Sequence, residues 1–314
     1  MRTVHTESPR KAAVFIRQGE IVAFPTETVY GLGANVFDEQ ALRKIFAAKK
    51  RPADNPFIVH VARIEEIELL ARRIPHSAEK LIQRFFPGPL TVIVPKQRAV
   101  PRAATAGLST VGIRMPRHPV AHAFLKACGV PVAAPSANLS GSPSSTTWRS
   151  VSFDLDGRIS CILKGGQTSV GLESTVVDCT GAVPEVLRSG AVTLEQLREI
   201  IPSTRIAIPR SAKAAKSPGT KYRHYSPRAR VIIVADAAEI GPTTNAAFIG
   251  TGALINARRF RFHRILPNVN AYAHELFYFF RLCDAAGVSK IYCQAVEPSG
   301  LGLALMDRIT RAAH

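Results

Sequence analysis

Residues 24–60 read FPTETVYGLGANVFDEQALRKIFAAKKRPADNPFIVH and combine a strand end, a polar loop with two glycines, a helix and a second strand. Asp38 is a residue type that caps helices, and the apolar residues after it recur at helical spacing over residues 38–48. The run FIVHVA, residues 57–62, has the continuous apolar character of a buried strand. A strand, a helix and a strand in this order indicate an α/β fold.

The same alternation continues to about residue 200. Short β-branched runs predict strands at residues 21–24, 57–62, 90–95, 111–114, 132–134, 160–163, 175–178 and 185–187. Apolar residues at helical spacing predict helices at residues 38–48, 77–86, 119–127 and 194–200, with Ser77 as the cap of the second helix. Since no long break separates these elements, we expect one α/β domain over residues 1–202.

The composition changes after Ile200. The next thirty residues, IPSTRIAIPRSAKAAKSPGTKYRHYSPRAR, are rich in Pro, Ser and Ala and have no amphipathic period, which predicts a linker at residues 203–230. Beyond it, VIIVAD, AAFIG and KIYCQA predict buried strands, with helices at residues 271–286 and near 301–312. We expect residues 231–314 to form a small Rossmann-like α/β domain, similar to half of a doubly wound sheet.

Much of the positive charge lies in the linker. The chain has a net charge of +18, and residues 201–230 carry eight Lys and Arg side chains and no Asp or Glu. A basic segment of this kind is most often a solvated linker, and contact with nucleic acid is the alternative.

Other features of the sequence exclude several classes of protein. No apolar run approaches the roughly 18 residues of a membrane span, and the N-terminus lacks the apolar core of a signal peptide, so we expect a cytoplasmic protein with no membrane contact. The five cysteines are scattered without a C-x-x-C pair, and we expect buried thiols rather than disulfides or metal ligands. Phosphate-loop, G-x-S-x-G, H-E-x-x-H and kinase signatures are absent, and Gly31-Leu32-Gly33 lacks the third glycine of a dinucleotide fingerprint.

Six polar clusters remain, at strand ends and in adjacent loops, where open α/β sheets place ligands: residues 25–33, 49–56, 109–116, 133–147, 171–178 and 186–190. Each has a structural explanation of its own. The cations at residues 49–51 could simply complement a helix dipole, and His60 could be a hydrogen-bonded core histidine. Arg114 needs a partner within its apolar strand, and a protein carboxylate and a substrate carboxylate are equally good candidates.

Taken in order, the clusters resemble the Sua5/YrdC/TsaC family, the threonylcarbamoyl-adenylate synthases. The matching segments are PTETVYGLG, AKKRPADNPFIVHV, FPGPLTVI, STVGIRMP, PVAAPSANLSG, ESTVVD, VLRSGAV and SPGTKYRHYSP. They span roughly residues 10–230, and the last segment with the domain after it is similar to the two-domain Sua5 form. The resemblance implies a YrdC-like twisted, mostly parallel sheet around a concave cavity.

The resemblance also implies a reaction. L-threonine, bicarbonate and ATP would be joined into threonylcarbamoyl-AMP with release of pyrophosphate, the first step of threonylcarbamoyladenosine (t6A) modification of tRNA. Mg²⁺ would be expected on the phosphates, although we find no dedicated metal ligands. The product would pass to a tRNA threonylcarbamoyl-transferase, and the basic surface would permit weak contact with tRNA.

Site residues follow from the resemblance, position by position. The residues implied for L-threonine are Thr28, His60, Arg114, Ser174 and, through its backbone, Ala134. The residues implied for catalysis at the ATP phosphates are Lys49 and Arg51. Further residues implied for ATP are Asn55, Thr110, Ser136, Ser144, Arg188 and Tyr225, the last in a linker segment that folds across the cavity in the family.

Two features depart from the family. Lys50 replaces the glycine that is common between the Lys49 and Arg51 positions, and the C-terminal domain is short. One alternative is a non-catalytic RNA-binding protein, but the linker has few aromatic side chains beyond Tyr222 and Tyr225 for base stacking. Another is a carbamoyl-adenylate-forming enzyme of hydrogenase maturation, whose zinc-finger cysteines and acylphosphatase-like segment this sequence lacks.

Overall fold

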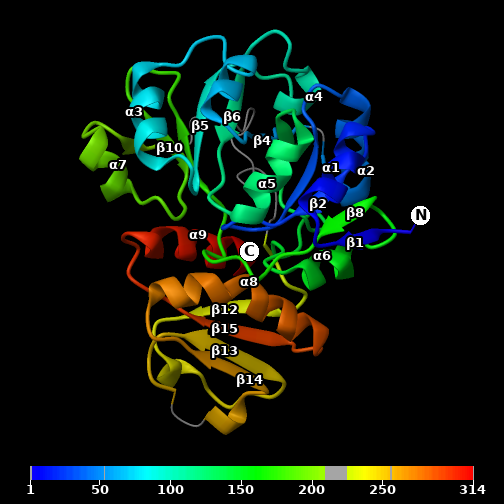
Figure 1. The fold of residues 1–314 in the computed structure, drawn as a ribbon. Helices are drawn as coiled ribbons and strands as arrows, with labels where there is room; N and C mark the ends of the chain where they lie inside the picture. The colour runs from blue at the N-terminus through cyan, green and yellow to red at the C-terminus, as the bar shows by residue number, and fades with distance from the viewer. Residues whose placement is uncertain (1, 53, 209–224, 255–256, 314) are drawn as a thin grey trace.

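A computed structural model describes residues 2–52, 54–208, 225–254 and 257–313. Its strands form two sheets, a large one in the upper part of the molecule and a small one below it (Figure 1). The middle of the expected linker, residues 209–224, lies outside the described residues. In the ranges that are described, no helix is long and apolar enough to cross a membrane.

The large sheet has the strand order β1-β8-β2-β3-β7-β4-β6-β5-β9-β10-β11 among the described residues. Its strands are β1 (Val4–Thr6), β2 (Val22–Phe24), β3 (Gly31–Asn35), β4 (Ile58–His60), β5 (Leu90–Pro95), β6 (Thr110–Arg114), β7 (Val132–Ala134), β8 (Cys161–Leu163), β9 (Thr175–Asp178), β10 (Glu185–Arg188) and β11 (Arg205–Ile206). Parallel pairs such as β4 with β6 and β5 with β9 are mixed with antiparallel pairs such as β2 with β3 and β5 with β6. The α/β fold class is confirmed.

Helices cover both faces of this sheet. They are α1 (Pro9–Arg17), α2 (Glu39–Lys49), η1 (Ile64–Leu69), α3 (His76–Phe85), α4 (Arg102–Thr105), α5 (Pro119–Cys128), α6 (Trp148–Leu155) and α7 (Leu194–Ile200). Helices α1 and α5 share one apolar cluster with β2, whereas α2 and α3 belong to a larger cluster with β5. Burial of these two apolar layers holds the strand ends in place.

The helix starts only partly follow the sequence prediction. Asp38 caps α2, as expected, and its side chain accepts hydrogen bonds from the backbone N–H groups of Gln40 and Ala41 at 2.9 and 3.0 Å. The prediction that Ser77 caps the next helix is wrong, because α3 already begins at His76, after Pro75.

The glycines of residues 25–33 also have a different role from the one expected. Gly31 and Gly33 lie within strand β3 rather than in a polar loop. A Cβ atom on Gly33 would be 2.6 Å from Val132 and 3.0 Å from the Phe24 ring. The two glycines therefore allow β3 to pack closely against its neighbours.

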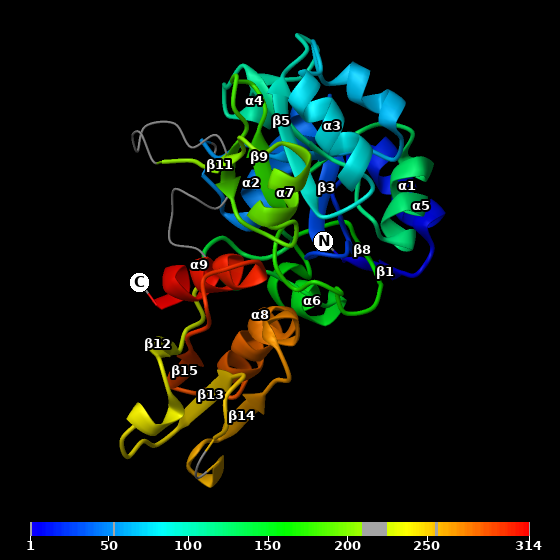
Figure 2. The same cartoon turned by 90° about the vertical axis from the view of Figure 1, so that its left-hand side faces the viewer.

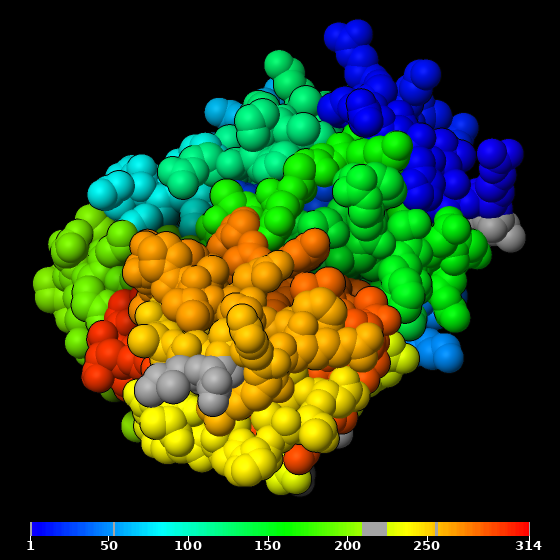
Figure 3. All heavy atoms as spheres, turned by 90° about the horizontal axis from the view of Figure 1, so that it is seen from below, coloured from blue at the N-terminus to red at the C-terminus, as the bar shows by residue number. Residues whose placement is uncertain are grey.

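The small sheet is parallel and has the order β12-β15-β13-β14 among the described residues. Its elements are β12 (Arg230–Val234), η2 (Ala237–Glu239), β13 (Ala246–Gly250), η3 (Ala257–Arg259), β14 (Phe262–Ile265), α8 (Val269–Ala285), β15 (Lys290–Gln294) and α9 (Leu301–Ala313). Figures 1 and 2 show α8 and α9 between this sheet and the larger domain. Seen from below, the C-terminal domain lies directly against the larger one (Figure 3).

The contact between the domains is a continuous apolar core. Val29 and Leu172 of the larger domain belong to the same buried cluster as Phe277 and Phe280 of α8. Gly171, with φ of +82°, packs so closely on α8 that a Cβ atom would be 2.5 Å from the backbone of His274. Two segments of the larger domain, around residues 29 and 171–172, are thus held by the C-terminal helices.

Candidate active site

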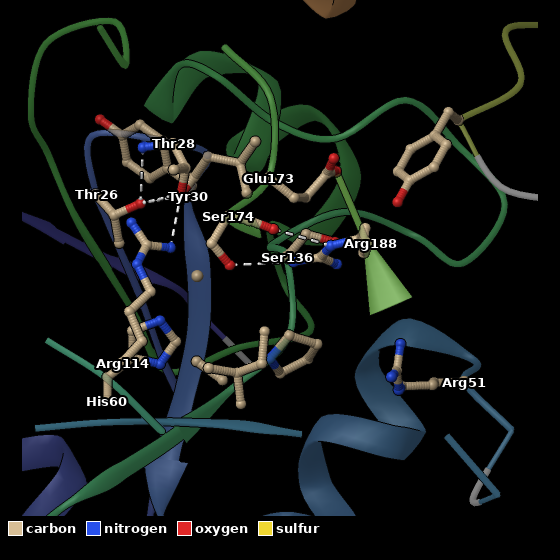
Figure 4. A pocket seen from close by; sticks show the side chains of 16 residues that line it. Thr26, Thr28, Tyr30, Arg51, His60, Arg114, Ser136, Glu173, Ser174 and Arg188 are labelled. Carbon is tan, nitrogen blue, oxygen red and sulfur yellow. Dashed lines mark hydrogen bonds between the residues drawn. The ribbon is translucent and has the colours of Figure 1, made fainter. Parts of the chain in front are cut away.

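One pocket collects residues from eight separate segments of the chain (Figure 4). The empty space within it is about 590 Å³, including solvent at its mouth. The expected site residues that line it are Thr28, Arg51, His60, Arg114, Ala134, Ser136, Ser174, Arg188 and Tyr225. Their roles toward substrates stay predictions.

Arg114 is fixed in the pocket by three neighbours. Parallel pairing of β4 with β6 places Arg114 beside His60 in register. The Arg114 guanidinium donates from Nη1 to the Thr28 hydroxyl at 2.8 Å and from Nε to the Gly88 carbonyl at 3.3 Å, while Nη2 lies 2.8 Å from Oε1 of Glu27. Of the two partners considered for Arg114, the structure therefore contains the protein carboxylate.

Glu27 lies in the first polar cluster, residues 25–33, and was not among the predicted site residues. Burial opposes its ionisation, but the positive charge of Arg114 lowers the pKa of Glu27 below its ordinary value. The two buried groups therefore form an ion pair. The requirement that a buried arginine have a partner was the available signal.

His60 stays neutral in this environment. Its side chain is buried and lines the pocket, and its ring centroid lies 5.7 Å from that of Phe24, with the two rings nearly perpendicular. Burial, together with the charge of Arg114, lowers the pKa of His60 to about 3. Its Nδ1 is buried and has no hydrogen-bond partner among the described residues.

Ser174 and Arg188 form a second bonded unit. Ser174 is held by the Thr91 hydroxyl, 2.8 Å away, and by Arg188, whose Nη2 donates to the Ser174 hydroxyl at 3.2 Å and whose Nε donates to its carbonyl at 3.1 Å. Figure 4 shows this unit between Thr28 and the more distant Arg51. Glu173, adjacent in sequence, also lines the pocket and was not predicted.

The cations at the end of α2 bond to backbone carbonyls. Arg51 lines the pocket, and its Nη2 donates to the carbonyls of Asn55 and Pro56, each at 3.2 Å. Lys49 is buried, and its Nζ donates to the carbonyls of Ser136, at 2.6 Å, and Asn138. Burial and the charge of Arg51 lower the pKa of Lys49 well below its ordinary value.

Four expected residues lie outside the lining of this pocket: Lys49, Asn55, Thr110 and Ser144. Thr110 lines a smaller hollow that shares Ile58 with the main pocket. Ser144 donates to Glu173 at 2.5 Å, and Asn55 contributes the carbonyl that Arg51 contacts. All four are therefore close to the lining residues without forming it.

Lys50 adopts a conformation that favours glycine. It ends α2 with φ of 52° and ψ of 44°, in the left-handed region. This geometry accounts for the glycine expected between Lys49 and Arg51, because only glycine takes it without strain.

The described residues contain no group of three or more His, Cys, Asp or Glu side chains that could hold a metal ion. All five cysteines are buried free thiols.

Comparison with known proteins extends over both domains. Residues 14–190 match the family model Sua5_yciO_yrdC, described as Telomere recombination. The chain belongs to the Sua5/YciO/YrdC family. Residues 192–314 match a second model, described as Threonylcarbamoyl-AMP synthase, C-terminal domain.

Relatives in this family are similar over nearly their whole length. Threonylcarbamoyl-AMP synthase of Pyrococcus abyssi is 45% identical over 97% of this chain and 93% of its own. The Bacillus subtilis protein of the same name is 41% identical over 96% and 92%. The crystal structure of P. abyssi Sua5 complexed with L-threonine superimposes with a TM-score of 0.90 and 43% identity, covering 99% of this chain and 97% of that one.

A more distant likeness is confined to the fold. Full-length HypF, in its phosphate- and nucleotide-bound form, is 20% identical with a TM-score of 0.51, and the match covers 57% of this chain and 28% of HypF.

Proposed function

We propose that this chain is an enzyme that forms L-threonylcarbamoyladenylate from L-threonine, bicarbonate and ATP and releases pyrophosphate. The observation that carries the proposal is one pocket in which Arg114, Thr28 and His60 face a space that Arg51 also lines. The pocket lies in a chain that is 45% identical, over nearly its full length, to a threonylcarbamoyl-AMP synthase.

The chemistry needs alignment more than a protein nucleophile. The threonine amine takes up the carbon of bicarbonate as a carbamate, with loss of water. A carbamate oxygen then attacks the α-phosphorus of ATP, and pyrophosphate leaves. Transfer of this kind depends on holding the reactants in line and neutralising phosphate charge, which arginine side chains can do.

We place L-threonine against Arg114, Thr28, His60, Ser174 and the backbone of Ala134. A substrate carboxylate would share the Arg114 guanidinium with Glu27, and the threonine hydroxyl or amine could bond to Nδ1 of His60.

We place ATP across the main pocket and the adjoining hollow. Arg51, Ser136, Arg188 and Tyr225 line the main pocket, and Thr110 lines the hollow. Lys49, Asn55 and Ser144 lie next to lining residues and would have to change their present contacts to reach the nucleotide. Because the described residues offer no carboxylate cluster, we propose that Mg²⁺ is carried into the site on the ATP phosphates.

Three further statements rest on the same proposal. The product passes to a tRNA threonylcarbamoyl-transferase, with weak tRNA contact through the basic surface. The protein works in the cytoplasm, where these substrates occur. The chain divides into a catalytic domain at residues 1–202, a linker at 203–230 and a C-terminal domain at 231–314.

The test is pyrophosphate release from ATP by the purified chain. We expect release only when L-threonine and bicarbonate are both present. Release that continues without threonine, or equally fast with carbamoyl phosphate in its place, would contradict the proposal.

A further inference from the structure

Arg308 of α9 is the largest fully buried side chain in the described part of the molecule, with an exposure of 0%. A charged group of this size is seldom removed from water unless its surroundings satisfy it. Helix α9 lies on the side of the C-terminal domain that faces the larger domain (Figures 1 and 2).

All three guanidinium nitrogens of Arg308 are bonded. Nε donates to Oε2 of Glu173 at 2.8 Å, and Nη2 donates to the Ser189 carbonyl at 3.0 Å. Nη1 donates to Asp307 of the same helix at 2.6 Å. The guanidinium also lies 5.3 Å from the centroid of the Tyr225 ring, which itself stacks on Phe277.

Two of these contacts reach segments that supply pocket residues. Glu173 directly precedes Ser174, and Ser189 directly follows Arg188. The two segments touch at Gly190, where a Cβ atom would be 2.4 Å from the backbone of Thr175. Arg308 therefore bridges the two segments at the point where they pack on each other.

Glu173 connects this bridge to the pocket. Its carboxylate lines the pocket and accepts a hydrogen bond from Ser144 on the side opposite Arg308. Burial opposes its ionisation, but the positive charges of Arg308 and Arg188 lower the pKa of Glu173 below its ordinary value. Without Arg308, this carboxylate would lose its strongest bonded partner within a buried site.

Stability alone is a weak reason for the arrangement. A buried ion pair stabilises a protein no more than a well-packed apolar pair of the same volume, whereas its directional bonds can fix one geometry. The geometry fixed here is that of Ser174 and Arg188, which bond to each other inside the pocket.

We propose that Arg308 is a positioning residue for the reaction, through which the C-terminal domain holds Glu173, Ser174 and Arg188 in their working arrangement. This inference rests on the proposed function for its kinetic consequences. It assigns the C-terminal domain a direct part in completing the site.

The kinetic test compares Arg308→Gln with Arg311→Gln. Arg311 lies on the same helix, is partly exposed and pairs with Asp307, so it is a matched control that leaves Glu173 untouched. We expect Arg308→Gln to lower kcat/KM for L-threonine about tenfold or more, and Arg311→Gln to change it less than about twofold. Arg308→Lys keeps the charge and should recover part of the loss.

A double-mutant cycle separates positioning from folding. Glu173→Gln and Arg308→Gln should each lower activity. The double variant should lose clearly less than the product of the two losses, because neither Glu173 nor Arg308 is then left as a buried charge without the other. An Arg308→Gln variant with a lowered Tm but unchanged kcat/KM would overturn the proposal. If that variant does not fold, an Arg308→Lys variant with full activity and no coupling to Glu173→Gln would overturn it instead.

A readout independent of turnover keeps this inference distinct from the proposed function. Hydrogen exchange measured by mass spectrometry should become faster over residues 172–190 in Arg308→Gln and stay unchanged there in Arg311→Gln. If the wild-type chain releases no pyrophosphate, the proposed function fails while this comparison still applies. Equal exchange in both variants would overturn the positioning role.

Discussion

The two sides of the pocket are built differently. The proposed threonine side, made of Thr28, His60, Arg114 and Ser174, comes from strand ends and the segments beside them. Its Thr28, Arg114 and Ser174 side chains bond to other side chains. The proposed phosphate side is at the end of α2, with Arg51 in the pocket lining and Lys49 outside it, and both cations donate to backbone carbonyls.

The difference bears on how each side would receive a ligand. The threonine side is already organised around a fixed charge, so a substrate carboxylate would meet a guanidinium held at three of its atoms. The cations of the phosphate side donate to backbone carbonyls, and phosphate oxygens make stronger hydrogen bonds to arginine and lysine than carbonyls do. We therefore expect the ATP phosphates to replace the backbone carbonyls as acceptors of these cations.

The largest effect should come from Arg114→Ala. This change removes the proposed partner of the threonine carboxylate and leaves Glu27 buried without its counter-charge. We expect kcat/KM for L-threonine to fall about a hundredfold or more, with little change in the KM for ATP. Arg98→Ala, at an exposed position after β5, is the control and should be near wild type. If the requirement for threonine and the affinity for it did not change, Arg114 would not be a threonine-binding residue.

Arg51→Ala should affect ATP rather than L-threonine, and its effect should be smaller than that of Arg114→Ala. Loss of one charge-assisted contact to phosphate should raise the KM for ATP about tenfold to a hundredfold and leave the KM for threonine nearly unchanged. The matched control is Arg43→Ala on the exposed face of α2, where Arg43 pairs with Glu39 at 3.6 Å. Steady-state kinetics with each substrate varied in turn would distinguish the two sides. A rise confined to threonine would reverse our assignment.

A third effect concerns His60 and the dependence of stability on pH. With a pKa of about 3 when folded and about 6.5 when unfolded, His60 takes up a proton only in the unfolded chain between these values. The unfolded state is favoured as pH falls through this window, so stability falls from about pH 6.5 downwards.

His60→Gln should remove that contribution, about 2 kcal/mol of the difference in unfolding free energy between pH 7 and pH 5. Denaturant unfolding at the two pH values measures it, with His122→Gln on the exposed face of α5 as control. An identical pH dependence in wild type and His60→Gln would show that His60 is not buried as described.

The smallest effect should come from Lys50→Gly. Because Lys50 has φ of 52°, glycine should relieve strain and raise the free energy of unfolding by up to about 1 kcal/mol. We expect the KM for ATP to stay within about twofold, since Lys50 is exposed and does not line the pocket. A marked loss of ATP affinity would indicate that the extra charge of Lys50 contributes to binding.

Local sequence patterns predicted the scaffold well. Helix α2 was predicted from the spacing of its apolar residues and from its cap, and strands β5, β7 and β9 from their apolar runs. These patterns are formed by residues that are neighbours in the sequence, so they can be recognised without knowing the fold. Strands β1, β3 and β14 and helices α1 and α6 were not predicted. Strand β3 contains Gly31 and Gly33, which allow close packing against Phe24 and Val132. Glycine has no local preference for strands, so no local pattern indicated this strand.

The long-range side-chain contacts of the site were not predictable in the same way. Thr28 and Arg114 are 86 residues apart, and Glu173 and Arg308 are 135 apart in separate domains. Such pairs exist only after the sheet and the domain contact have formed. The sequence indicated that Arg114 needed a partner, but not that Glu27 would provide it.

Calorimetric binding of L-threonine and of ATP, each measured separately to wild type, Arg114→Ala and Arg51→Ala, tests the division of the pocket most directly. We predict that Arg114→Ala weakens threonine binding at least about tenfold and leaves ATP binding nearly unchanged, while Arg51→Ala does the reverse. If both variants weakened the same ligand, or each weakened both ligands equally, the two-sided account of this pocket would be contradicted.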